Sequence, residues 1–94
     1  MGAPATAVAF SADGQIAGAL AIYRGFTVEE TTGGAPAVVR IYDGTSNAGL
    51  LIESIALAAG ESASDWLADG GLRCATGIYV DVVSGTVNGS VRVG

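Results

Sequence analysis

Apolar and polar residues alternate with a period of two along much of this chain, most clearly near the C-terminus. In residues 78–83 and 87–93 the apolar side chains recur at alternate positions, and Ser84-Gly85 separates the two runs. Successive side chains of a β-strand point to opposite faces, so this pattern is typical of strands with one buried face. It predicts two strands joined by a turn.

Two turn signals compete in this region, Ser84-Gly85 and Asn88-Gly89. Asn-Gly is the stronger dipeptide for a two-residue hairpin, but register favours Ser84-Gly85. That turn pairs Ile78 with Val91 and keeps the apolar side chains on one face, whereas a slip by one residue would invert a face. Gly89 then lies within a strand, which marks a bulge or a close approach of another backbone.

A second hairpin is predicted in the middle of the chain, with arms at about residues 36–43 and 49–58. Its connecting stretch, DGTSNAG at residues 43–49, has the residues of a calcium loop and of a turn. Aligned from Asp43, Thr45, Ala48 and Ser54 do not fit three of the four further positions of a calcium loop, so we interpret the stretch as a turn. The second arm is apolar on both faces apart from Glu53 and Ser54. We therefore expect its own fold or another subunit to cover both faces.

The remaining segments are less regular. In residues 20–28 an arginine interrupts the inward-facing positions, and a bulge at Arg24-Gly25 is predicted to turn its side chain outward. Segment 60–73 breaks the alternation, and Ser62 with Asp65 resembles a weak capping box before one short helical turn. Residues 1–15 are small except for Phe10 and are predicted to form an extended arm. Glycine-rich turns separate the strands.

Together these segments predict an all-β fold. We expect a small β-sandwich or jelly-roll-like barrel of six to seven short strands. Residues 1–15 would be the N-terminal arm, and residues 16–94 would form a single β domain.

The charge of the chain limits its partners. Nine acidic residues face four arginines, without lysine or histidine, and the net charge is -5. Nucleic acid and anionic membrane surfaces both attract basic patches, so we expect neither as a partner. No apolar run reaches the ~20 residues of a spanning helix. The N-terminus has no basic region typical of a signal peptide, so we expect synthesis in the cytoplasm.

Catalysis is not expected. The absence of histidine and lysine excludes Ser-His-Asp triads, imidazole metal ligands and Schiff-base lysines. Glu29 and Glu30 are adjacent, so on a strand they point to opposite faces, and we interpret Asp65 and Asp69 as solvated surface acids. Cys74 is the single cysteine and is predicted to be a buried, inert thiol. No catalytic, metal-binding or cofactor-binding residue is predicted.

The aromatic residues could form a platform for sugar binding. The candidates are the tyrosines and the tryptophan, namely Tyr23, Tyr42, Trp66 and Tyr79. Only Tyr42 and Tyr79 are predicted to face outward, and they belong to separate hairpins. We therefore interpret these side chains as core or subunit contacts.

Assembly is expected because large side chains are few, with 17 alanines and 15 glycines in 94 residues. A domain with so small a core is marginal alone, which predicts a homo-oligomer, specifically a trimer. Leu51 and Ile55, in the doubly apolar strand 50–58, are its predicted contact residues. Phe10 is predicted to anchor the arm on a sheet edge of a neighbour, with the arm disordered in the free protein.

A resemblance supports a structural role. The run "YRGFTVEETTGGAPAVVRIYDGTSNAGLLIESIALAAGES", followed by "GIYVDVVSGTVNGSVRV", resembles small proteins of the structural-gene clusters of tailed bacteriophages over residues 20–94. The resemblance implies a virion component, and within that class a capsid decoration (cement) protein that binds the major capsid protein on the head surface. The alternatives are a tail, head-fibre or other minor virion component, or a small carbohydrate-binding β module.

Overall fold

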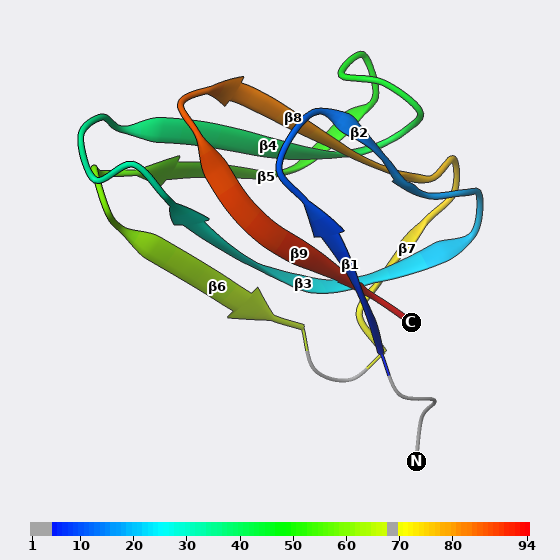
Figure 1. The fold of residues 1–94 in the computed structure, drawn as a ribbon. Coiled ribbons are helices and arrows are strands. Elements are labelled where there is room, and N and C mark those ends of the chain that lie inside the picture. The colour runs from blue at the N-terminus through cyan, green and yellow to red at the C-terminus, as the bar shows by residue number, and fades with distance from the viewer. Residues whose placement is uncertain (1–4, 68–69) are drawn as a thin grey trace.

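In the part of the chain that the structure describes, nine β-strands form two antiparallel sheets that pack face to face (Figure 1). The computed structural model describes residues 5–67 and 70–94, and no helix occurs within these ranges. Sheet A has the strand order β1-β9-β3-β6, with β7 also paired to β3, and sheet B has the order β2-β8-β4-β5. The strands are β1 (Thr6–Phe10), β2 (Gly14–Ala17), β3 (Ala21–Glu30), β4 (Ala37–Asp43), β5 (Leu50–Leu57), β6 (Ser62–Trp66), β7 (Leu72–Cys74), β8 (Ile78–Ser84) and β9 (Val87–Val93).

The predicted all-β sandwich is confirmed, although the described residues form nine strands instead of six to seven. Its core lies between the two sheets. Alternate residues of each strand point inward, as the period-two pattern requires. The largest fully buried side chains come from both sheets, so each sheet covers the other. They are Tyr23, Val28, Val87 and Val91 with Cys74 from sheet A, and Val39, Ile41, Leu57, Ile78 and Val80 from sheet B.

The middle hairpin and the bulge in β3 are also confirmed. Strands β4 and β5 pair antiparallel from Ala37–Leu57 to Asp43–Leu50, close to the predicted arms. The register between β3 and β9 shifts between Tyr23 and Gly25, which places the bulge at Arg24. The Arg24 side chain is not turned fully outward, because its Nε is buried. Both features depend on local sequence, namely a turn between two apolar runs and a polar residue in an inward position.

The C-terminal hairpin is wrong in its pairing, although the chain does turn at Ser84-Gly85. Strand β8 pairs with β4 and β2 in sheet B, and β9 pairs with β3 and β1 in sheet A. Gly85 has φ +82°, a left-handed conformation that glycine adopts without steric cost. Both strands bury one apolar face whether they pair with each other or face each other across the core, so the alternation could not separate the two arrangements.

The N-terminal arm is also wrong for the residues that the structure describes. Strand β1 pairs with β9 through five residues, and β2 pairs with β8. Phe10 is only 6% exposed and belongs to the core. The segment packs because Val8 and Phe10 alternate with alanines, which gives a short strand an inward face. Residues 1–4 lie outside the described residues.

Residues 62–66 form strand β6 instead of a helical turn. This strand pairs with β3 from Glu29–Ser62 to Gly25–Trp66. The Asp65 carboxylate accepts a hydrogen bond from the Trp66 backbone N–H at 2.9 Å, so it does not cap a helix. The backbone pairing with β3 outweighs a weak local capping signal.

Candidate binding surfaces

The three predicted interaction residues do not share a surface. Phe10 and Ile55 are each 6% exposed and lie in the core, so their roles as contact residues are wrong. Both are large apolar side chains at inward positions of their strands, where burial between the sheets satisfies them. Leu51 is 48% exposed, and it remains available to a partner.

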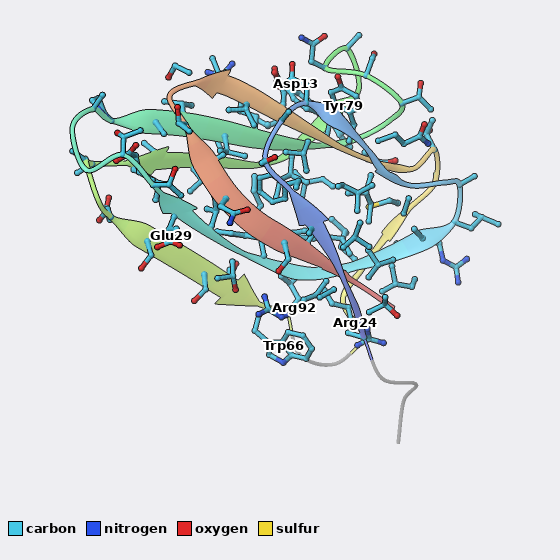
Figure 2. All side chains as sticks on the ribbon, in the orientation of Figure 1. Asp13, Arg24, Glu29, Trp66, Tyr79 and Arg92 are labelled. Atoms are coloured by element: carbon cyan, nitrogen blue, oxygen red, sulfur yellow. The ribbon has the colours of Figure 1, made fainter. Side chains whose placement is uncertain are left out.

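Leu51 lies at one end of a row of side chains on the outer face of sheet B. In the strand register, Leu51 of β5 is opposite Tyr42 of β4, Tyr42 is opposite Tyr79 of β8, and Tyr79 is opposite Gln15 of β2. We call these four residues the tyrosine row. Tyr42 is buried but stands outside the core cluster, as expected of a side chain covered by its neighbours on an outer face. Figure 2 shows Tyr79 on the side of the molecule away from sheet A.

The tyrosine row corrects the expectation that Tyr42 and Tyr79 lie apart in separate hairpins. They are direct cross-strand partners because β4 and β8 are neighbours in sheet B. Their sequence separation gives no local signal of this pairing. The row therefore places aromatic and apolar side chains next to each other on one sheet face, and the cores of protein interfaces are enriched in such side chains.

The strand that carries Leu51 is also an edge of its sheet. Strand β5 pairs with β4 on one side only, and Leu50 beside Leu51 is 72% exposed. An exposed edge with apolar side chains is a template for pairing with another chain unless charges or bulges protect it. The other edge of sheet B is strand β2, which is shorter than β5. Just before β2, the Asp13 carboxylate accepts a hydrogen bond of 2.6 Å from the Val82 backbone N–H.

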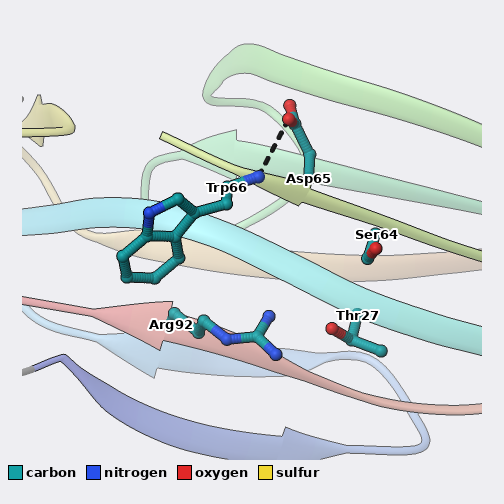
Figure 3. Close-up of a pocket in the computed structure, with 5 residues that line it drawn as sticks. All are labelled: Thr27, Ser64, Asp65, Trp66 and Arg92. Atoms are coloured by element: carbon teal, nitrogen blue, oxygen red, sulfur yellow. Dashed lines mark hydrogen bonds between the residues drawn. The ribbon is translucent and has the colours of Figure 1, made fainter. Parts of the chain in front are cut away.

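The outer face of sheet A is different in character. Trp66 is 56% exposed there, although it was not expected to face outward. Its ring and the Arg92 side chain lie beside a hollow (Figure 3). The hollow has a volume of about 420 Å³ and is also lined by Thr27, Ser64 and Asp65. The helical turn predicted within segment 60–73 does not indicate this outward position of Trp66.

The acidic residues of the predicted turns have structural partners. The Asp43 carboxylate accepts backbone hydrogen bonds from Ala75 at 3.2 Å, Thr76 at 3.0 Å and Gly77 at 3.3 Å. These bonds hold the loop before β8 in place, so Asp43 has a structural role that does not require a calcium ion. In residues 5–67 and 70–94, no three His, Cys, Asp or Glu side chains are grouped to hold a metal ion.

The side chains of Glu29 and Glu30 point to opposite faces, as predicted. Glu29 is exposed, whereas Glu30 is 3% exposed. The pair of Asp65 with Asp69 cannot be assessed, since Asp69 lies outside the described residues. Cys74 is buried, as predicted, and burial raises the pKa of its thiol, which makes the reactive thiolate less accessible.

One pair of carboxyl groups does lie close together, between the two sheets. Glu53 of β5 is opposite the inward-facing Ile41. Desolvation and the nearby Asp65 raise the pKa of the Glu53 carboxyl. Tyr23 contributes a hydroxyl that is buried and without a hydrogen bond of normal length among the described residues. Its pKa is raised by burial and then by Glu53.

Glu53→Gln should therefore stabilise the protein at neutral pH. A raised pKa means that the folded state binds the Glu53 proton more tightly than the unfolded state does, so this contribution to stability is lost as pH rises through the folded pKa. Glutamine keeps the shape without the charge. We expect a melting temperature a few degrees higher at pH 7 and a smaller gain at pH 4, by circular dichroism. The exposed Glu29→Gln serves as the control, and an equal gain at both pH values would contradict the charge argument.

Among the residues that the structure describes, no helix is long and apolar enough to cross a membrane. Comparison of the chain with models of protein families, with curated proteins and with solved structures finds no significant match.

The two outer faces of the sandwich therefore carry the argument about function. Sheet B has an apolar edge with the tyrosine row, and sheet A has a polar hollow beside an exposed tryptophan.

Proposed function

We propose that this protein is a non-enzymatic virion structural protein, a capsid decoration protein that binds the head shell of a tailed phage as a homo-oligomer. The resemblance over residues 20–94 supports the virion class. The β-sandwich is compatible with it, because this fold presents two broad faces and several sheet edges to partners. The proposed location is the capsid surface, after synthesis in the host cytoplasm.

The observation that carries the proposal is the exposed edge of β5 next to the tyrosine row. Leu50 and Leu51 expose 72% and 48% of their surface at this edge. On the same outer face, Tyr42 and Tyr79 lie next to Leu51 in turn, on the neighbouring strands β4 and β8. Burying apolar surface stabilises a complex by about 25 cal/mol per Å² before the costs of association are subtracted. An edge strand adds main-chain hydrogen bonds when it pairs with a second chain.

Two kinds of partner would use this edge. A second copy of the chain would pair along β5 and produce the homo-oligomer, for which we propose a trimer. The major capsid protein would then contact the assembled faces. The contact with the capsid protein depends on the assembled oligomer, so one substitution at the β5 edge tests both contacts together.

Leu51→Asp should weaken assembly and particle binding without unfolding the domain. A charge at a desolvated contact costs several-fold to a hundredfold in affinity, and we expect at least a tenfold loss, or about 1.4 kcal/mol. The matched control is Val83→Asp, because Val83 is 46% exposed on the same sheet but near the far end of β8. Light scattering measures the oligomer, and occupancy on phage particles that lack the protein measures binding.

Wild-type protein that is monomeric at micromolar concentration and does not bind the particles would overturn the proposal. Equal losses with Leu51→Asp and Val83→Asp would contradict the role of the β5 edge. Counting copies per virion separates a decoration protein, present in many copies on the head, from a tail or head-fibre component, which is present in few.

A further inference from the structure

Two adjoining hollows cross the outer face of sheet A. The first has a volume of about 420 Å³ and is bounded by Trp66 and Arg92. The second, of about 480 Å³, extends over β9 to β1. Thr27 lines both, so they form one continuous trough, which we call the Trp66 trough. The other residues that line the second hollow are Ala9, Val28, Glu29, Ser62, Asn88, Gly89 and Ser90.

The strand register explains the shape of the trough. Its floor runs across four strands, from Ser64 through Thr27 and Ser90 to Ala9. With neighbouring strands about 4.8 Å apart, the floor is about 14 Å long. Larger side chains stand on both sides of it. Trp66 and Arg92 flank Gly25 on one side, and Glu29 pairs with Asn88 on the other.

The trough combines an apolar plane with many hydrogen-bonding groups. The indole of Trp66 offers a flat exposed surface, and amphipathic aromatic rings of this kind bind ligands that are apolar on one face and polar at the rim. The hydroxyls of Thr27 and Ser64 can each donate and accept a hydrogen bond. Arg92 makes no hydrogen bond with the other residues drawn in Figure 3, where one bond joins Trp66 to Asp65.

These features fit a sugar chain better than other ligands. Nucleic acid needs several basic residues, whereas the trough holds one arginine against one carboxylate, that of Glu29, and the Asp65 carboxyl lies near Glu53 on the inner side. An apolar peptide needs an apolar groove, and the floor consists mainly of hydroxyl-bearing side chains. A neutral oligosaccharide has carbohydrate C–H faces for the indole and hydroxyl groups for the Ser, Thr, Asn and Arg side chains.

We propose that the Trp66 trough binds a neutral oligosaccharide chain, with one sugar ring stacked on Trp66 and neighbouring hydroxyls bound by Arg92 and Thr27. The trough lies on the opposite outer face from the tyrosine row, as the positions of Trp66, Arg92 and Tyr79 in Figure 2 show. A copy held through sheet B would therefore keep its sugar-binding face exposed. The inference does not depend on the proposed virion role.

The test uses the full chain and a panel of neutral probes: soluble hexasaccharides of glucose, mannose, xylose and N-acetylglucosamine. Titration calorimetry should detect at least one of them with a Kd in the micromolar to millimolar range. Trp66→Ala should weaken that binding at least tenfold, and Thr27→Val several-fold. Leu50→Ala is the matched control, because it removes an exposed apolar side chain from the opposite sheet and should leave the affinity unchanged.

We expect each variant to stay folded, since Trp66 and Thr27 contribute no side chain to the core cluster, and circular dichroism melts check this. The inference would be overturned if none of the hexasaccharides binds, or if the protein binds only an anionic polysaccharide such as heparin. An unchanged affinity of Trp66→Ala for the sugar would overturn it as well. Leu51→Asp separates the two proposals, because it should lose particle binding and keep sugar binding.

Discussion

Replacing Gly89 by alanine should strongly destabilise the protein. A Cβ at this position would collide with the carbonyl oxygen of Thr27, and it would lie 3.0 Å from the Cα of Val28 and 3.1 Å from the Phe10 ring. Two of these neighbours are backbone atoms of the paired strand β3, so they cannot move without breaking the ladder. Overpacking of this kind typically costs about 1–3 kcal/mol, and we expect the upper part of that range.

The measurement is thermal unfolding of Gly89→Ala beside Gly14→Ala. Gly14 also lies in a strand, but a Cβ built there meets nothing within 4 Å, so its replacement should change the free energy of unfolding by less than about 0.5 kcal/mol. For a domain of this size, a loss of 2–3 kcal/mol lowers the melting temperature by roughly 10 °C or more. Similar melting temperatures for the two variants would show that β3 and β9 do not pack as closely as described.

Gly89 also shows how far the sequence could predict the fold. A glycine in an otherwise apolar strand position indicated a close backbone approach, and the structure places β3 and Phe10 there. The β4–β5 hairpin and the bulge at Arg24 were predictable for the same reason, since each depends on neighbouring residues. Strand alternation also specified which side chains face the core.

The errors arose where partners are distant in sequence. Alternation specifies the buried face of β8 and β9 but not which sheet each strand joins, because both arrangements bury the same side chains. Segment 6–10 has an inward face of its own, but its place in sheet A depends on β9, where Gly89 lies opposite Phe10. The candidate sites were hidden for the same reason. Tyr42 meets Tyr79 through β4–β8 pairing, and Trp66 faces outward because residues 62–66 pair with β3.

The role of Glu30 could not be predicted from the residues next to it in the sequence either. It ends β3 and holds two loops with its carboxylate. The carboxylate accepts hydrogen bonds from the Thr32 N–H at 2.9 Å, the Thr32 hydroxyl at 2.6 Å, the Gly33 N–H at 2.6 Å and the Gly60 N–H at 2.9 Å. Gly60 belongs to the connection from β5 to β6, so this one side chain joins the loops at that end of the sandwich.

Glu30→Gln should therefore lower the melting temperature at pH 7 by about 10 °C, because an amide offers one acceptor oxygen where the carboxylate offers two. The hydrogen bonds, first that of the Thr32 hydroxyl and then that of the Gly60 N–H, lower the pKa of Glu30 to about 2. A carboxyl in the unfolded chain has a pKa of about 4.3. The stabilisation is then complete above about pH 4.5 and is lost as the pH falls through 2.

The measurement is the melting temperature as a function of pH. Wild-type protein should lose stability between about pH 4.5 and pH 2, and Glu30→Gln should lose less stability over the same range. The melting temperatures of the two proteins should therefore approach each other near pH 2. The exposed neighbour Glu29→Gln should follow the wild type throughout. A constant difference between wild type and Glu30→Gln from pH 7 to pH 2 would show that the ionised carboxylate does not hold the loops.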